Sequence, residues 1–170
     1  NPKLHVETLE VAKTSPLAIE QTAGQLCFGQ VIEQYLNDHK ATWGEKQYSS
    51  QKAKLYYFLE YLENTDGLPA SERTLESVTN AVARQYKEHL QVSPTNAKQK
   101  YPALSPQESV IAAKKDGSKT LGITSQNNYL QCLSTLFNFA VKELDYEGKN
   151  PFKGRSNTKA AKKDQRDKRN

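Results

Sequence analysis

Apolar residues recur every three or four positions in four stretches of this 170-residue chain, which is the spacing of an amphipathic helix. The stretches predict helices over 28–39, 45–64, 80–90 and 124–144. The stripe of the last helix consists of Leu130, Leu133, Phe137, Ala140, Val141 and Leu144. The alternating pattern of a strand is almost absent. The sequence therefore predicts an all-α fold, a bundle of four main helices.

The segment 91–123 has the character of an insertion between two of these helices. Its Ser-Pro-Gln-Glu run at 105–108 matches a capping box with proline at the first helical position. Gly117 supplies a stop signal. These signals predict a short extra helix over 106–116.

Charge is distributed unevenly along the chain, whose net charge is +5. Residues 153–170 contain eight Lys or Arg against two Asp, and residues 1–152 are close to neutral. A basic tail of this kind favours a polyanionic partner, nucleic acid first. Its low apolar content predicts a disordered interdomain linker over 153–170. Residues 1–25 have weak periodicity and form a lead-in without an assigned role, which leaves 26–152 as the predicted domain.

Several classes of protein are excluded by composition. Cys27 and Cys132 lie far apart with no Cys or His cluster around them, which argues against a disulfide scaffold, a zinc site or any other metal or cofactor. No segment has the length of apolar sequence that a membrane span needs, so we expect no membrane contact. The cysteine usage, without a disulfide pattern, predicts a cytoplasmic location. The chain begins at Asn1 and contains no methionine, which predicts a fragment of a longer protein.

A set of markers in a fixed order resembles a known family. The last predicted helix runs into a Gly-Lys-Asn-Pro-Phe turn at 148–152, and the other markers are Trp43, the Thr-Leu-Glu-Ser-Val-Thr run at 74–79, Lys-Tyr-Pro at 100–102 and the capping box. Over 26–152 they resemble the DNA-clamping, core-binding domain of tyrosine recombinases, the phage integrases. Two positions depart from the family pattern. Gln126 replaces a β-branched apolar residue, and Asn128 replaces a basic one.

The resemblance implies a SAM-like orthogonal bundle that holds double-stranded DNA at a core recombination site. Members of the family cut DNA with a tyrosine, assisted by Arg, Lys, His and a His-x-x-Arg pair. None of His5, His39 and His89 is followed by Arg at that spacing. We therefore expect no DNA cleavage by this chain, and we expect the catalytic domain to lie beyond Asn170. The resemblance further implies a parent enzyme that is tetrameric on DNA in the bacterial cytosol, and a monomeric fragment.

Polar and basic side chains suited to DNA gather in three places. Helix 45–64 offers Lys46, Gln47, Ser49, Ser50, Lys52 and Lys54. Helix 124–144 offers Thr124, Ser125, Asn127, Asn128 and Gln131 near its N-terminus, where the helix dipole favours phosphate. Amide side chains can pair with adenine, so the last three are the predicted base-reading residues. In the linker, Lys159, Lys162, Lys163 and Arg166 are predicted to follow the phosphate backbone.

Alternatives remain open from the sequence alone. Polar helix faces are commonly solvated surface, and the chain could be a helical protein-interaction module with a solubilising tail. An RNA-binding helical domain is disfavoured, because the aromatic residues have the spacing of a core and not of an open stacking surface.

Removal of residues 153–170 tests the role predicted for the tail. If its cations neutralise phosphates, the truncated chain should bind every duplex more weakly, whatever its sequence. The dependence of log Kd on log salt should flatten by roughly 0.9 for each phosphate that is no longer neutralised. Titration of cognate and scrambled duplexes at several salt concentrations measures both effects. An unchanged salt slope would contradict the prediction.

Overall fold

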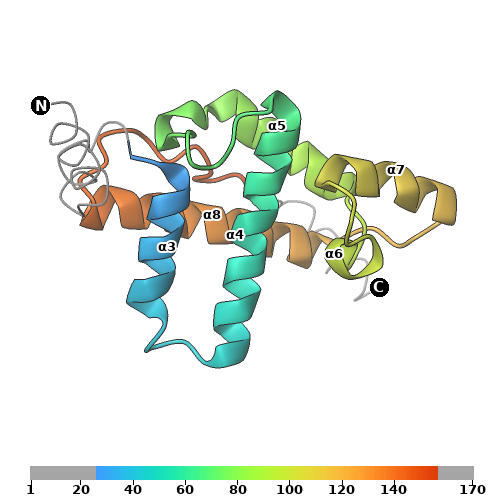
Figure 1. The fold of residues 1–170 in the computed structure, drawn as a ribbon, viewed down its shortest axis with the longest axis horizontal. Coiled ribbons are helices and arrows are strands. Elements are labelled where there is room, and N and C mark those ends of the chain that lie inside the picture. Colours follow the sequence, from blue (N-terminus) through green and yellow to red (C-terminus); the bar gives the residue numbers. More distant parts are fainter. Residues whose placement is uncertain (1–25, 157–170) are drawn as a thin grey trace, which may run out of the picture.

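The computed structural model describes residues 26–156 of the chain (Figure 1). This part contains six α-helices and one 3-10 turn, joined by loops. They are α3 (Phe28–His39), α4 (Glu45–Asp66), η2 (Leu75–Ser77), α5 (Asn80–Val92), α6 (Ala97–Lys100), α7 (Pro106–Asp116) and α8 (Ile123–Glu143). No strand occurs in this part of the chain, only two isolated bridges. The all-α prediction is confirmed. The predicted lead-in 1–25 and residues 157–170 of the predicted linker lie outside the described residues.

The local signals place most helix ends within two residues. Ser105 accepts from the Glu108 backbone N–H while the Glu108 side chain accepts from the Ser105 N–H, so α7 begins with the predicted capping box. α4 continues to Asp66 instead of ending at residue 64, because Gly67 adopts φ 75° and closes the last turn with an N–H to the Glu63 carbonyl. The sequence missed α6, a four-residue helix that buries none of its side chains and so has no apolar pattern.

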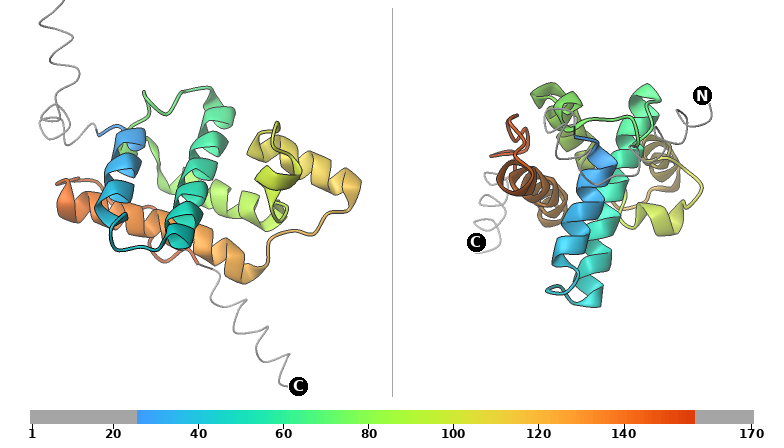
Figure 2. Two further views of the ribbon diagram at one scale, coloured as in Figure 1. Left: turned by 60° about the horizontal axis from the view of Figure 1, so that its bottom comes forward. Right: turned by 60° about the vertical axis from the view of Figure 1, so that its left-hand side comes forward.

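The helices form a bundle in which α8 runs across the others (Figure 1). α3 and α4 lie side by side as a hairpin, and α8 packs against both of them and against α5. The left view in Figure 2 shows α8 crossing this hairpin, with α6 and α7 beyond its N-terminal end. This crossing is the orthogonal arrangement expected from the resemblance.

The core lies where α3, α4, α5 and α8 meet. The ring of Phe137 on α8 is fully buried, with centroids 5.8 Å from Phe28 and 5.8 Å from Phe152. The predicted α8 stripe is wrong at one position, since Val141 is 44% exposed and Leu136 is buried beside Phe137 instead. The buried positions Leu133, Leu136, Phe137 and Ala140 centre the core face near Ala140, and Val141, about 100° further round the helix from Ala140, lies at the edge of that face.

The turn after α8 is fixed by Asn150. Its Nδ2 donates to the Ser134 carbonyl at 2.9 Å and to Asn138 Oδ1 at 3.0 Å, and its Oδ1 accepts from the Phe152 N–H at 2.9 Å. These bonds bring the chain back against the middle of α8. Phe152 can therefore enter the core beside Phe58, at a centroid distance of 5.5 Å.

The predicted insertion is closed at its base. The Leu121 N–H donates to the Ser93 carbonyl, and the Thr95 N–H donates to the Lys119 carbonyl, both at 2.9 Å. α7 docks on the C-terminal half of α4 through Gln107, whose Nε2 donates to the Tyr61 carbonyl at 2.9 Å.

A buried polar network joins α4 to α5. The Tyr57 hydroxyl hydrogen-bonds with His89 Nε2 at 2.9 Å and with Ser93 Oγ at 2.7 Å. The Tyr61 ring packs against the same histidine at a tilt of 44°, with centroids 4.8 Å apart. Tyr56 is not part of this network and lines a cavity beside Cys27, on a different face of α4.

Truncation of the core aromatic should be costly. We expect Phe137→Ala to lower the free energy of unfolding by about 3–5 kcal/mol, because it removes a fully buried ring and leaves a cavity. Val141→Ala is the matched control on the same helix and should cost less than about 1 kcal/mol. Urea denaturation measures both values, and similar losses for the two variants would contradict the observed rotation of α8.

The buried histidine should make stability depend on pH. Burial lowers the pKa of His89 to about 4, whereas free imidazole has a pKa of about 6.5. The unfolded chain therefore binds this proton more readily, so the stability is fully present above about pH 6.5 and is lost as the pH falls toward 4. Between pH 7 and pH 5 the free energy of unfolding should fall by about 2 kcal/mol.

Denaturant titrations across this interval test the prediction, with His89→Gln as the control. That variant cannot titrate, so its stability should change little between pH 7 and pH 5. Hydrogen bonds lower the pKa of the Asp66 and Glu108 carboxylates, so the contributions of these two groups to the free energy of unfolding are lost only at more acidic pH. A pH slope that persists in His89→Gln would assign the effect to another group.

Candidate nucleic-acid interface

A groove of about 540 Å³ separates the N-terminal half of α4 from the N-terminal half of α8. The C-terminal end of α3 closes it on one side. Its lining residues are Tyr35, His39, Trp43, Gln47, Ser50, Gln51, Lys54, Asn128, Gln131, Cys132 and Thr135. Five of these were predicted from the sequence as DNA-contacting residues, three on α4 and two on α8.

The two long helices present matching faces to this groove. α4 contributes positions 47, 50, 51 and 54, and α8 contributes positions 128, 131, 132 and 135. Both sets follow the i, i+3, i+4, i+7 spacing that places side chains on one side of a helix. Gln51 on α4 and Cys132 on α8 are 81 residues apart in the sequence. The two helices therefore bring four amide side chains from distant parts of the chain to a single surface.

Among the described residues that line the groove, Lys54 is the only lysine or arginine. Its Nζ donates to Ser50 Oγ at 2.6 Å and lies 5.5 Å from the centroid of the Tyr129 ring. No carboxylate pairs with it within residues 26–156. The ammonium group is therefore held at the wall of the groove by a hydroxyl and an aromatic face, and its charge is not neutralised there.

An aromatic group closes the groove at the α3 end. The His39 and Trp43 rings stack with centroids 4.6 Å apart and an interplanar angle of 23°. His39 Nδ1 donates to the Tyr35 carbonyl at 2.9 Å, which fixes the ring at the C-terminus of α3. His39 Nε2 is therefore the ring nitrogen that this bond leaves available.

The remaining predicted residues do not line the groove. Lys46, Ser49 and Lys52 are exposed on other faces of α4, and Thr124 is exposed in the first turn of α8. Ser125 and Asn127 are half-buried. The tail residues Lys159, Lys162, Lys163 and Arg166 lie outside the described residues.

The sequence missed several groove residues, namely Tyr35, His39, Trp43, Gln51, Cys132 and Thr135. Gln51 had an available signal, since it completes the helical face formed by Gln47, Ser50 and Lys54. The role of Cys132 had none, because it depends on which part of α4 packs against α8.

The start of α8 explains one departure from the family pattern. Gln126 is buried, and its Nε2 donates to the Leu121 carbonyl at 2.9 Å. The Gln126 amide thus provides a hydrogen-bond donor for this loop carbonyl, which an apolar side chain could not do. It connects the end of the insertion to the helix that forms one wall of the groove.

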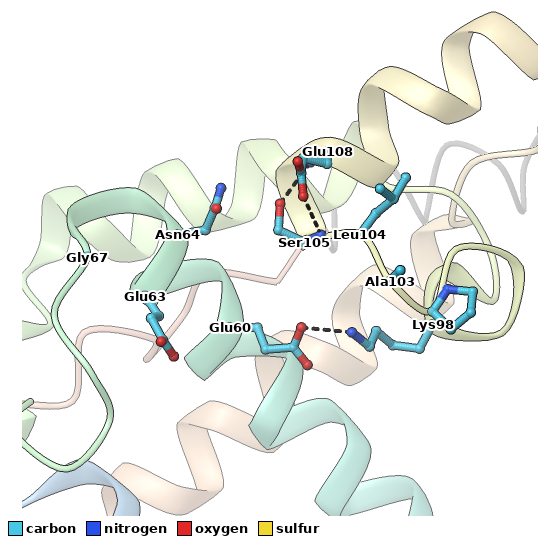
Figure 3. Close-up of a pocket in the computed structure, with 10 residues that line it drawn as sticks. Glu60, Glu63, Asn64, Gly67, Lys98, Ala103, Leu104, Ser105 and Glu108 are labelled. Atoms are coloured by element: carbon cyan, nitrogen blue, oxygen red, sulfur yellow. Dashed lines mark hydrogen bonds and ion pairs between the residues drawn. The ribbon is translucent and has the colours of Figure 1, made fainter.

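A second cavity of similar size has different chemistry. It lies between the C-terminal half of α4 and the insertion, and its lining includes Glu60, Glu63 and Glu108 (Figure 3). Lys98 pairs with Glu60 at 2.8 Å. Three carboxylates against one lysine disfavour a polyanion here. The groove between α4 and α8 has no Asp or Glu among its described lining residues.

A family model described as the phage integrase SAM-like domain matches residues 27–162. The chain belongs to this family. The match covers the whole helical bundle and extends into the basic tail. No curated protein and no solved structure matches the chain.

Two other kinds of site are not found in the described part of this SAM-like domain. Residues 26–156 contain no group of three or more His, Cys, Asp or Glu side chains that could hold a metal ion. None of their helices has the length and apolarity required to cross a bilayer.

Proposed function

We propose that this SAM-like domain binds double-stranded DNA through the groove between α4 and α8. In this role it positions a phage-type site-specific recombinase on its core recombination site. The observation that carries the proposal is the composition of the groove, whose lining within residues 26–156 combines four amides and a lysine that pairs with no carboxylate, and contains no Asp or Glu. Membership of the integrase family makes DNA the expected ligand of such a surface.

The amide groups suit base recognition. Base edges in the major groove are read by side chains that both donate and accept hydrogen bonds, and Asn and Gln are the usual partners of adenine. Asn128 and Gln131 are exposed on the groove side of α8. They are the proposed base-reading residues of that helix.

The charge pattern of α4 also supports the proposal. Its first ten residues contain Lys46, Lys52 and Lys54 against Glu45, and its second half contains Glu60, Glu63 and Asp66 with no cation. A helix dipole favours the reverse arrangement, with acids first and bases last. The pattern therefore does not serve the stability of the helix, and it places the lysines on the half of α4 that borders the groove, with Lys54 in the groove itself.

The parent protein proposed here is a tyrosine recombinase that breaks and rejoins DNA. Its catalytic Arg, His-x-x-Arg and Tyr groups would belong to a separate domain that partners this one. Tetrameric assembly on DNA in the bacterial cytosol is part of the same proposal.

The alternative, a protein-interaction module, would favour a continuous apolar surface. The large apolar side chains exposed in residues 26–156 are Leu68, Val92, Ile111 and Val141. They lie on four different segments: Leu68 in the loop after α4, and the other three on α5, α7 and α8 respectively. Scattered positions of this kind are ordinary surface.

Two lysines on α4 give a matched test. Lys54→Gln removes the charge at the groove wall, so it should weaken duplex binding on all sequences and reduce the salt slope by about 1. Lys52→Gln removes an equal charge from another face of the same helix and should change the slope much less. Fluorescence anisotropy with the full chain, starting at low salt, measures both.

The possible outcomes separate the hypotheses. Equal effects of Lys52 and Lys54 would indicate diffuse electrostatics and would contradict the groove as the binding site. If the unaltered chain shows no salt-dependent duplex binding, the proposal of DNA binding is wrong and the protein-interaction module is favoured.

A further inference from the structure

Gln51 and Cys132 meet across the floor of the groove. Cys132 Sγ lies 2.9 Å from Gln51 Oε1 and 3.8 Å from the Gln51 backbone carbonyl. Both residues line the groove, one from α4 and one from α8. Cys132 is buried, whereas Gln51 is half-buried.

The direction of this hydrogen bond follows from the state of the thiol. Burial raises the pKa of Cys132 to about 12, so the thiol keeps its proton at neutral pH. A protonated thiol donates, and the amide oxygen of Gln51 accepts. Within residues 26–156 no hydrogen bond engages Gln51 Nε2, so both of its N–H groups remain for a ligand.

We propose that Gln51 is a specificity-determining residue and that Cys132 is its positioning residue, fixing the amide so that only N–H donors face the DNA. This inference rests on the proposed function.

The base that Gln51 selects follows from hydrogen-bond chemistry. A free glutamine amide offers one donor edge and one acceptor, which matches the N6 donor and N7 acceptor of adenine. With its oxygen held against the thiol of Cys132, the amide turns its N–H donors toward the DNA. The purine edge that presents acceptors alone in the major groove is guanine, through N7 and O6. Gln51 should therefore select guanine at one position of the site.

Selection from a randomised duplex library with the full chain tests the assignment. The unaltered chain should enrich guanine at one position, and Gln51→Ala should lose that enrichment and keep the others. Cys132→Ala frees the amide to use both of its edges, so the preference should shift from guanine toward adenine. Cys132→Ser keeps a hydroxyl donor in the same place and should retain guanine.

A base analogue probes the contact directly. On the selected duplex, replacement of that guanine by 7-deazaguanine removes the N7 acceptor and should weaken binding by the unaltered chain by about tenfold, the value of one hydrogen bond of about 1.4 kcal/mol. The same replacement should have no effect on binding by Gln51→Ala. A loss that is equal for both proteins would overturn the contact.

A double-mutant cycle separates positioning from a general structural role. If Cys132 acts through Gln51, adding Cys132→Ala to Gln51→Ala should produce no further change in base preference. Thermal unfolding of each variant shows whether it is folded under the binding conditions. A further change in preference in the double variant would overturn the role of Cys132.

Failure of this inference is distinguishable from failure of the proposed function. If the chain binds and selects duplexes but Gln51→Ala leaves every preference intact, the role of Gln51 is wrong and DNA binding by the groove stands. If the unaltered chain binds no duplex at low salt, both are wrong.

Discussion

Four phenylalanine rings, each from a different segment, fix the crossing on which the groove depends. Phe28 of α3 contacts Phe58 of α4 and Phe137 of α8, both at 5.8 Å. Phe152, in the turn after α8, closes the cycle at 5.5 Å from Phe58 and 5.8 Å from Phe137. Aromatic pairs at these separations add to the stability gained by burial. Lys54 lies about one turn from Phe58, so the crossing sets how far α4 and α8 stand apart at the groove.

The crossing divides α4 into two halves with different surroundings. The C-terminal half is covered by α7 and by α5, through Gln107 and the network of Tyr57 with His89. In the N-terminal half, residues 45–54 are all exposed or half-buried. The covered half carries Glu60, Glu63 and Asp66 with no lysine, and the open half carries three lysines and Glu45. The insertion thus occupies the part of α4 that a polyanion would avoid, and the groove stays open.

Local signals were sufficient for the helices but not for the groove. The helix over Phe28–His39 and the helix over Pro106–Asp116 were predicted with their observed bounds, because their apolar spacing and caps lie within the segments themselves. Val141 was misplaced because a stripe read by three- and four-residue steps can drift by one position around the helix. Gln47, Ser50, Lys54, Asn128 and Gln131 were selected by residue type. That they share one surface, and that Gln51 meets Cys132 there, follows from the packing of α4 on α8, which no local pattern specifies.

The division of charge between bundle and tail suits separate roles for affinity and selectivity. Residues 26–156 contain sixteen Lys and Arg against fourteen Asp and Glu, and residues 157–170 contain six against two. Phosphate neutralisation supplies most of the affinity for DNA but carries no sequence information. In the proposed complex the nearly neutral bundle contributes few phosphate contacts, and its groove contributes amides held by α4 and α8. A base-recognition surface with little net charge contributes little binding free energy on non-cognate DNA. The electrostatic attraction that is common to all sequences comes from elsewhere in the chain. The free energy that the groove does supply then depends on the base sequence, which is the property required of a domain that places a recombinase on one site.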